Sequence, residues 1–497
     1  PVAEGVSLAL DPERGEVLLL DGRGDDARTI RPLPARRRVA DALCAAAVDD
    51  GIRVFVGDGE GVWEHWHLRR AADGAWAARS VRTLHTGPDS ELCALSPDGA
   101  RLFVAEERLG IWAFAAGPEA PEERVLLEHR PGFEAEGLVV EGAGLAWIDG
   151  AGAHHAVDLS RLPPRRRSRP VVPARAESAT VARFGDAADD PAIHVAGEVR
   201  LVLGTDKQDG LLLMDADGAE LARLSTGRLN NVDVRAEGPE TAIAVATDRT
   251  RGALAVFRLH TAPPRLEPLV GDTALELGDP YGLCLGRGPD GALHAFANDT
   301  DGRVVHLRLR IRENRVALEP VASWRMESQT EGCVVDDERG LFWLGEEARG
   351  VWRFPFDARG AEDGELAVDA AAATELVPDV EGLARLREPS GRELLLVSSQ
   401  GDDSYGLFDV TAPEARWIGS FRIGADHAAG VDGASETDGL ELHPSDLGGR
   451  YPGGVLVVQD GRNRMPEAPQ NFKFVALADV FAALAESERT AAGEPEP

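Results

Sequence analysis

Carboxylate side chains gather in short clusters along the second half of the chain, where few basic residues accompany them. The clusters are Asp186-Ala187-Ala188-Asp189-Asp190-Pro191, Glu331, Glu346-Glu347, Asp379-Val380-Glu381, Asp432 with Glu436 and Asp438, and Asp460. Most aspartates of a β-rich chain lie in turns, but adjacent carboxylates such as Asp189 and Asp190 repel each other unless a cation lies nearby. Calcium takes about six to eight oxygen ligands in flexible geometry. The chain has no His or Cys spacing typical of zinc, so the pattern favours calcium over a transition metal.

These clusters converge only if the fold brings distant segments together. Short β-rich runs such as Arg101–Ala105, Gly340–Leu344 and Gly454–Gln459 recur along the chain, separated by turn residues. Fourteen Asp-Gly pairs occur, and Asp-Gly favours tight hairpin turns. The clearest helical segment is Leu477–Glu486. Many short strands with small turns predict an all-β fold of the propeller type, in which carboxylates from several blades meet at one end of the axis.

The overall composition narrows the classes of protein. The chain has 497 residues, with 53 Lys+Arg against 85 Asp+Glu, and a formal net charge of −32. This charge excludes an ordinary nucleic-acid binder, which needs a basic face. It does not exclude a phosphate substrate, because bound cations invert the local field. No apolar run is long enough to span a membrane, so no membrane association is expected.

An internal repeat indicates a duplicated domain. The run Ser90-Glu91-Leu92-Cys93 is followed by Ala105-Glu106-Glu107, and Thr330-Glu331-Gly332-Cys333 is followed by Gly345-Glu346-Glu347, each match offset by the same 240 positions. We expect an incomplete propeller-like domain over 1–162, a linker over 163–173, a complete propeller over 174–484 and a disordered tail over 485–497. The proline- and arginine-rich segment near residues 162–170 is interpreted as a solvated linker, with a patch for an anionic ligand as the alternative.

The four cysteines are too few for a disulfide scaffold. Cys44 and Cys93 stand at the positions of Cys284 and Cys333 in the two copies. Two interpretations stay open. Each pair forms a disulfide between neighbouring innermost strands, or all four are small buried apolar side chains.

The second copy closely resembles the β-propeller phytases, which are calcium-dependent alkaline phytases. The resemblance covers about residues 174–481 and rests on several motifs in the same order. These are Asp186-Ala187-Ala188-Asp189-Asp190-Pro191-Ala192-Ile193, Asn230-Asn231-Val232-Asp233-Val234-Arg235, Ser328-Gln329-Thr330-Glu331-Gly332, Asp379-Val380-Glu381-Gly382-Leu383, Ser398-Ser399-Gln400-Gly401, Asp432-Gly433 through Thr437-Asp438-Gly439, Tyr451-Pro452, Val458-Gln459-Asp460-Gly461 and Gln470-Asn471-Phe472-Lys473.

The resemblance implies a six-bladed propeller with two groups of calcium ions. The structural group would be held by Glu177, Asp190, the carbonyls of Pro191 and Val232, Asp432, Asp438 and Asp460. The catalytic group would be held in the mouth by Asp189, Glu331, Glu347, Asp379, Glu381 and Tyr281. Lys207, Arg249 and Tyr281 would face the phosphates of the substrate.

The implied activity is that of a 3-phytase, a phosphoric monoester hydrolase. It would hydrolyse calcium phytate (myo-inositol hexakisphosphate) by attack of a metal-activated water, releasing phosphate and lower inositol phosphates. The expected location is secreted or periplasmic. Two alternatives are a single-metal propeller hydrolase of the lactonase type and a non-catalytic calcium-stabilised binding propeller. The first would leave Asp189-Asp190-Pro191 unexplained, and the second would not need Lys207 or Glu347.

The chain departs from the family pattern at a few positions. His194 stands where the first signature usually ends in Trp, Gln208 replaces a second basic residue beside Lys207, and Thr300 replaces a common lysine. These changes put phosphate affinity and positional preference in doubt. The first copy keeps Glu91, Glu107 and Glu136 but lacks most of the acidic clusters. We expect the first copy to be catalytically inactive by itself and to pack on the second domain or on another chain. It then either modulates substrate capture or stability, or is a structural remnant.

Overall fold

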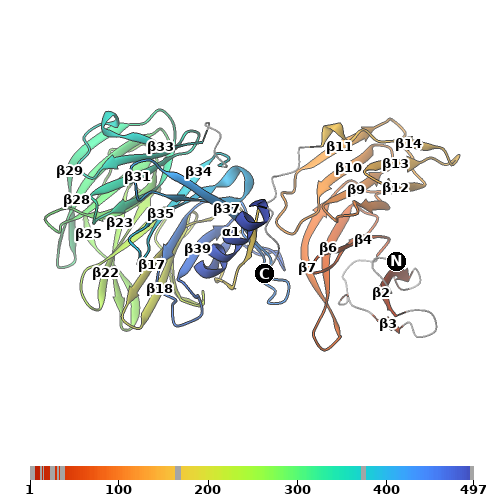
Figure 1. Ribbon diagram of the computed structural model, residues 1–497, viewed down its shortest axis with the longest axis horizontal. Helices are drawn as coiled ribbons and strands as arrows, with labels where there is room; N and C mark the ends of the chain where they lie inside the picture. The colour runs from red at the N-terminus through yellow and green to blue at the C-terminus, as the bar shows by residue number, and fades with distance from the viewer. Residues whose placement is uncertain are drawn as a thin grey trace. The chain divides into compact units, whose positions relative to one another are not determined.

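The computed structural model describes residues 6–11, 14, 16–22, 28–30, 33, 40–162, 169–370 and 376–492 (Figure 1). The chain forms two compact units. The first unit contains Pro1–Arg167 together with two later segments, Ala425–Asp432 and Arg464–Glu467. The second unit contains the rest, Ser168–Gly424, Gly433–Asn463 and Ala468–Pro497.

The second unit consists of six sheets of four or five strands. In order from the first sheet, their strands are β17 (Ala188–Ala196), β18 (Val199–Asp206), β19 (Gly210–Asp215) and β20 (Glu220–Ser225); β21 (Leu229–Ala236), β22 (Thr241–Asp248), β23 (Ala253–Thr261) and β24 (Pro264–Pro268); β26 (Pro280–Arg287), β27 (Leu293–Asp299), β28 (Arg303–Arg312), β29 (Arg315–Arg325) and β25 (Val270–Asp272); β30 (Thr330–Asp336), β31 (Leu341–Glu346), β32 (Gly350–Pro355) and β33 (Glu365–Asp369); β34 (Val380–Arg387), β35 (Glu393–Ser399), β36 (Ser404–Asp409), β37 (Arg416–Gly424) and β15 (Val171–Pro173); β38 (Leu440–His443), β39 (Val455–Asp460), β40 (Asn471–Ala476) and β16 (Ala176–Glu177).

The first strand of each four-stranded meander contacts the first strand of the next, and β38 returns to β17. The innermost strands β17, β21, β26, β30, β34 and β38 therefore form a ring. β16, from the start of the unit, pairs with β40 in the last sheet, so the two ends of the ring are joined by main-chain hydrogen bonds. This is the all-β, propeller-type architecture expected from the sequence.

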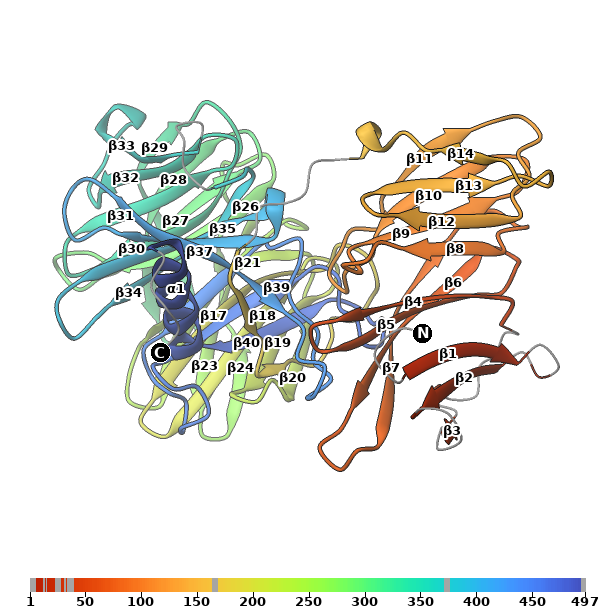
Figure 2. The same cartoon turned by 45° about the vertical axis from the view of Figure 1, so that its right-hand side comes forward.

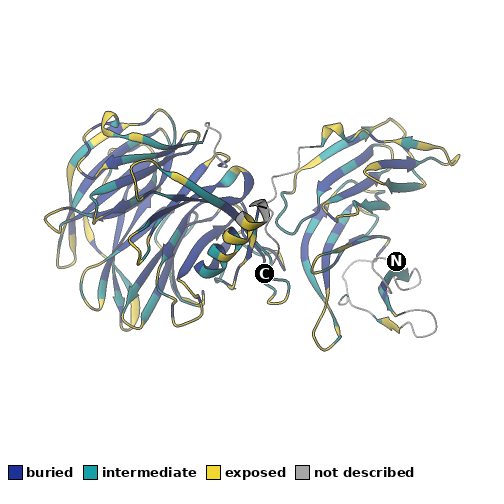
Figure 3. Ribbon diagram, viewed as in Figure 1, coloured by how far each residue is buried: buried dark blue, intermediate teal, exposed yellow. Residues whose placement is uncertain are grey.

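Hydrophobic side chains fill the space between successive sheets. Leu203 and Leu213 of the first sheet, for example, pack with Val234 and Ala244 of the second. Figure 3 shows the consequence, with buried strands in dark blue and exposed residues concentrated in the turns. Both faces of these strands are buried, so successive side chains are apolar whichever face they point to. This explains the near-continuous hydrophobic sequences of the strands.

The first unit contains, among the described residues, four sheets of three or four strands, labelled in Figure 2. Their strands are β1 (Val6–Asp11), β2 (Glu16–Asp21) and β3 (Arg28–Ile30); β4 (Ala42–Val48), β5 (Gly51–Gly57), β6 (Val62–Arg70) and β7 (Trp76–His85); β8 (Leu92–Leu95), β9 (Arg101–Glu106), β10 (Gly110–Ala115) and β11 (Arg124–His129); β12 (Gly137–Glu141), β13 (Gly144–Ile148) and β14 (His154–Ala156).

The same side-chain hydrogen bond occurs in both units. Trp112 Nε1 on β10 donates to Glu106 Oε2 at 2.7 Å, and Trp352 Nε1 on β32 donates to Glu346 Oε2 at 2.8 Å. These residues are related by the 240-residue offset of the sequence repeat. The repeat thus extends to a specific contact between the second and third strands of a sheet.

Parts of the expected linker and tail have regular structure. Val171–Pro173 form β15, which pairs in parallel with β37, whereas residues 163–168 lie outside the described residues. The helix α1 spans Leu477–Ala492. Residues 485–492 are therefore helical, and the expectation of a disordered tail was wrong for them. Residues 493–497 lie outside the described part. The described α-helix falls short of the length and apolarity needed to cross a membrane.

Candidate active site

Five of the six innermost strands share one irregularity, a β-bulge near the start of the strand, which positions residues of the site. Regular pairing breaks between residues 188 and 191 in β17, 229 and 232 in β21, 280 and 283 in β26, 330 and 333 in β30, and 380 and 383 in β34. Each break leaves two residues out of register, as a β-bulge does. The first residues of these pairs are Asp189, Asn230, Tyr281, Glu331 and Glu381. Asp438 stands two residues before β38.

Glycines at the second bulge position let neighbouring strands approach closely. A Cβ at Gly332 would lie 2.2 Å from the carbonyl oxygen of Glu381, and a Cβ at Gly282 would lie 1.9 Å from that of Glu331. No other residue type fits such a backbone contact. The ring is therefore narrow at this level, which brings the polar side chains of different sheets into contact.

The ammonium group of Lys207 is a positive charge among the aspartates of the site. Its Nζ lies 3.1 Å from Asp189 Oδ2, 3.1 Å from Asp438 Oδ2 and 2.5 Å from Asp186 Oδ1. Asp189 and Lys207 are both buried. One lysine thus balances part of a larger negative charge.

Two asparagines connect the carboxylates. Asn230 Nδ2 donates to Asp189 Oδ2 at 3.2 Å and to Glu331 Oε1 at 3.0 Å. With its amide oriented to satisfy its neighbours, Asn231 donates to Glu331 Oε1 at 3.2 Å and to the carbonyl of Tyr281 at 3.1 Å. These donors fix the orientation of Glu331.

Glu331, Glu347 and Glu381 form the most compact group of acidic oxygens in the site. One carboxylate oxygen from each lies within 4.8 Å of the others. Glu347 Oε1 and Glu381 Oε2 are buried and have no hydrogen-bond partner, and the same holds for Asp189 Oδ1. Unpaired buried carboxylate oxygens are costly. The group therefore fits a hard cation bound by oxygen ligands.

The electrostatics agree with this interpretation. Burial raises the pKa of Glu331, and the adjacent Glu381 and Asp438 raise it further. The pKa values of Glu381, Asp189 and Asp438 are also raised, first by burial. Burial raises the pKa of Glu347 to about 7, with Asp379 and Asp438 contributing. Without a cation, these groups are pushed towards their protonated forms.

Tyr281 and Arg249 line another part of the site. The Arg249 guanidinium lies 5.1 Å from the centre of the Tyr281 ring, its Nη1 donates to Asn230 Oδ1 at 3.1 Å, and its Nε donates to Asp279 Oδ1 at 2.9 Å. The negative charge of Glu331, followed by burial, raises the pKa of Tyr281. Tyr281 is therefore a neutral phenol that donates or accepts hydrogen bonds.

Asp379 lies at the edge of the site. Its side chain is exposed, and its charge contributes to the raised pKa of Glu347. The compact three-glutamate group does not include it. Among the expected catalytic residues it is the most open to solvent.

The residues expected to hold structural calcium fall in different places. Asp438 lies with the catalytic residues beside Lys207. Asp190, Pro191 and Val232 line a cavity within the ring, together with Asp233, Arg235 and Glu441. The main-chain N–H of Val232 donates to Asp190 Oδ2 at 3.0 Å.

Glu177 and Asp460 meet around a buried lysine. Lys473 Nζ lies 2.7 Å from Glu177 Oε2 and 3.3 Å from Asp460 Oδ2. Asp432 belongs to a segment grouped with the first unit, where it accepts a hydrogen bond from the main-chain N–H of Arg464 at 2.5 Å.

Disulfides join Cys284 to Cys333 and Cys44 to Cys93, and each pair is separated by 49 residues. The first links β26 to β30, the strands that carry Tyr281 and Glu331. The Cα atoms of this pair lie 5.6 Å apart.

Sequence reasoning gave no role to Asn230, Asn231 or Gln400. Gln400 Nε2 donates to Asp438 Oδ1 at 2.5 Å. Asn230 stands at the bulge position of β21, equivalent to Asp189 and Glu331, so aligning the starts of the innermost strands would have identified it. Gln400 follows the end of β35, and no periodic signal marks it.

The chain is similar to known proteins over much of its length. A family model described as Phytase matches residues 151–491. A 3-phytase from Bacillus subtilis (strain 168) is 32% identical over 331 residues, covering 63% of this chain and 86% of the relative. A solved structure titled Crystal structure of Nidogen/Laminin Complex is 11% identical with a TM-score of 0.34, covering 54% of this chain and 84% of that one.

Proposed function

The chain belongs to the phytase family, as its motifs indicated, and we propose that it is a calcium-dependent 3-phytase whose active site is the acidic mouth of the second unit. Phytate hydrolysis is the activity of the chain, and its substrate is a small molecule. The enzyme is a hydrolase. The location that we propose is secreted or periplasmic.

One observation carries the calcium proposal. Glu331, Glu347 and Glu381 place one carboxylate oxygen each within 4.8 Å of the others, and two of these glutamates have buried oxygens without a hydrogen-bond partner. Oxygen-only donors in an irregular arrangement suit calcium. Glu331, Glu347, Glu381 and Asp189 would hold the ions, with Asp379 at the exposed edge.

Bound calcium would supply positive charge towards the phosphate oxygens and make an attacking water more acidic. The chain's own residues orient the carboxylates and add positive charge to the site. Lys207 keeps Asp189 and Asp438 in place and adds a positive charge. Asn230 holds Glu331 by a hydrogen bond. Positioning and charge stabilisation of this kind account for most of phosphoryl-transfer catalysis.

Arg249 and Tyr281 are the proposed contacts for substrate phosphate. Arg249 already binds a carboxylate, that of Asp279, and a guanidinium binds phosphate in the same two-pronged way. A phosphate would compete with Asp279 for this guanidinium. The neutral Tyr281 hydroxyl is able to donate to a phosphate oxygen.

A second group of calcium ions is proposed for the structural role, held at separate places by Glu177, Asp190, Asp432, Asp438 and Asp460 and by the carbonyls of Pro191 and Val232. Asp190 is buried and lines a cavity with both carbonyl-bearing residues. Burial and the neighbouring Asp189 raise the pKa of Asp190. These features favour a cation beside Asp190.

The first unit is proposed to be non-catalytic alone. Asp41, Glu91 and Glu136 stand just before β4, β8 and β12, whereas their counterparts Tyr281, Glu331 and Glu381 are the second residues of β26, β30 and β34. Glu91 is exposed, unlike the buried Glu331. Packing of this unit on the second unit or on another chain stays a prediction. Removal of residues 1–165, with kinetics and thermal stability compared, tests a modulatory role.

The experiment that tests the main proposal measures phosphate release from calcium phytate near neutral pH, with and without EDTA. We expect release by the wild type, loss with EDTA and recovery with added calcium. The variant Glu347→Gln should lose most of the activity. Glu362→Gln, which changes an exposed glutamate of the same unit, should keep it. Release that survives EDTA, or equal loss in both variants, would contradict the proposal.

A further inference from the structure

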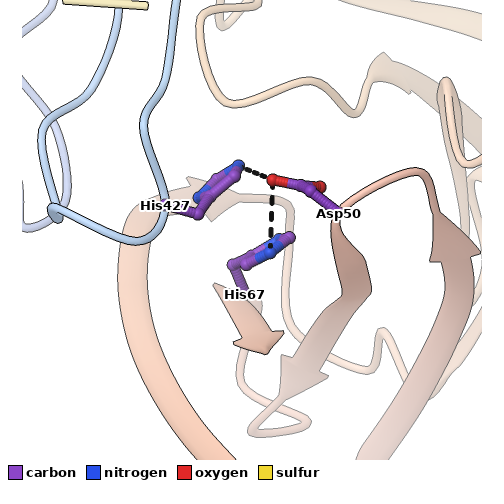
Figure 4. A group of neighbouring side chains, drawn as sticks. All are labelled: Asp50, His67 and His427. Carbon is purple, nitrogen blue, oxygen red and sulfur yellow. Dashed lines mark ion pairs between the residues drawn. The ribbon is translucent and has the colours of Figure 1, made fainter. Parts of the chain in front are cut away.

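A second cluster of side chains that could ligate a metal lies in the first unit. Asp50 stands in the turn between β4 and β5, His67 lies in the middle of β6, and His427 belongs to the segment Ala425–Asp432. Figure 4 shows the two imidazole rings beside the Asp50 carboxylate. All three residues are part of the same compact unit.

Both imidazoles approach one oxygen atom. His67 Nε2 lies 3.6 Å from Asp50 Oδ2, and His427 Nε2 lies 3.3 Å from it. Ligand atoms around one tetrahedral ion, with bonds of about 2.0–2.1 Å, lie about 3.3–3.4 Å from each other. The observed separations are near those that a single ion would impose.

One of the proposed ligand atoms has no hydrogen-bond partner. His67 is 2% exposed, and its Nε2 atom has no hydrogen-bond partner. A buried ring nitrogen in this condition is costly unless something binds it. The turn between β4 and β5 leaves space for this nitrogen because residue 51 is glycine: a Cβ at Gly51 would lie 2.8 Å from His67 Nε2.

The two imidazole rings lie face to face beside the Asp50 carboxylate. The rings stack with centres 3.6 Å apart and planes 8° from parallel. Coordination requires them to turn so that the Nε2 lone pairs converge.

The loop that carries His427 is held in place by other contacts. Arg79 Nε on β7 donates to the carbonyl of His427 at 3.2 Å. The carboxylate of Asp426 accepts the main-chain N–H groups of Ala428 and Ala429. A fixed loop lowers the entropic cost of binding an ion.

We propose that Asp50, His67 and His427 form a site for one divalent transition-metal ion of the zinc class. Two imidazoles and one carboxylate favour such an ion over calcium, which takes oxygen ligands. With a water as fourth ligand the set is complete. The ion clips the segment Ala425–Asp432 to the β4–β5 turn and β6. The site is distinct from the proposed calcium groups and does not depend on the proposed activity.

The test is titration of the calcium-saturated full-length protein with Co²⁺, followed by visible absorption. We expect one tightly bound Co²⁺ with the intense spectrum of a tetrahedral nitrogen–oxygen site, removed by one equivalent of Zn²⁺. A site made of carboxylates alone gives the weak spectrum of octahedral cobalt. The spectrum therefore distinguishes Co²⁺ bound in the acidic mouth from Co²⁺ bound at the proposed histidine site. His427→Gln and Asp50→Asn should each weaken binding by about 100-fold. The control His85→Gln alters an exposed histidine of β7 and should bind as the wild type does.

A second measurement guards against misfolding of the variants. Zn²⁺ should raise the unfolding temperature of the wild type and of His85→Gln in excess calcium, and leave that of His427→Gln unchanged. Unchanged cobalt affinity in folded His427→Gln overturns the proposal. So does a purely octahedral spectrum, or failure of the calcium-saturated wild type to bind either metal.

Discussion

Glu331 and Glu381 hold the same place in adjacent innermost strands, and one carboxylate oxygen of each lies within 4.8 Å of the other. Each is the first residue of the pair that steps out of register in its strand. Burial, followed by the negative charge of Glu381, raises the pKa of Glu331, because two buried carboxylates this close repel each other. A calcium ion would offset the negative charge of the pair.

The first prediction concerns pH and stability without metal. A folded-state pKa above the ordinary value means that the folded protein binds more protons than the unfolded one. Stability from this source is complete below the ordinary value of 4.5 and is lost as pH rises through about 7 for Glu347. We expect the unfolding temperature in EDTA to fall between pH 5 and pH 8.

Calcium should reverse this trend, because it binds the ionised carboxylates. A shift of this size at Glu347 alone corresponds to about 3 kcal/mol, so the difference between calcium and EDTA at pH 8 should reach about 5 °C or more. Calorimetry at both pH values checks it. An EDTA curve that rises from pH 5 to pH 8 would contradict the assignment.

The second prediction separates stability from catalysis at one residue. Glu381→Gln places an amide hydrogen-bond donor beside Glu331 and removes a negative charge. In EDTA at pH 8 we expect the variant to be at least as stable as the wild type. Phosphate release should fall by about 100-fold or more, because the unpartnered Oε2 ligand is lost. A variant that loses both stability in EDTA and phosphate release would indicate that Glu381 has a merely structural role. Glu362→Gln again serves as the control.

The third prediction tests the close contact of neighbouring strands. Gly332→Ala would place a Cβ 2.2 Å from the carbonyl oxygen of Glu381, so the backbone must shift. We expect a loss of about 1–3 kcal/mol in stability together with weaker calcium binding. Gly278→Ala is the matched control, because a Cβ at that position would have no neighbouring atom within 4 Å. Urea unfolding and calcium titration of both variants provide the measurement. Equal behaviour of the two would show that the ring tolerates widening.

Much of the fold was predictable because hydrophobic and turn residues act locally. Alternating apolar runs and Asp-Gly turns indicated short antiparallel strands, and the helix begins at Leu477 as expected. The acidic residues of the mouth were also recognisable, because their charge has no local partner. The tail was different. Its polar residues continue the helix to Ala492, which the lower apolar content did not suggest.

The remaining features depend on contacts between distant segments. Lys207 was expected to face substrate, yet it is buried among Asp186, Asp189 and Asp438, and only the fold brings these together. Asn230 of β21 donates a hydrogen bond to Glu331 of β30, and no spacing along the chain reveals this contact. His67 and His427 are separated by most of the chain, and grouping of the segment Ala425–Asp432 with the first unit has no sequence signal.

The last prediction concerns the two disulfides, which close loops of the same length in the two units. A bridge across 49 residues limits the unfolded chain and stabilises the folded one by up to about 4 kcal/mol. We expect Cys284→Ala with Cys333→Ala to lower the unfolding temperature of the second unit, and Cys44→Ala with Cys93→Ala to lower only that of the first. Phosphate release at about 25 °C should be unchanged in both. Glu331 stays in place without the bridge, because Asn230 and the close strand contact at Gly332 also hold it. Calorimetry with activity assays on both double variants decides the point, and a loss of activity before any unfolding in the first of them would show that the bridge positions Glu331.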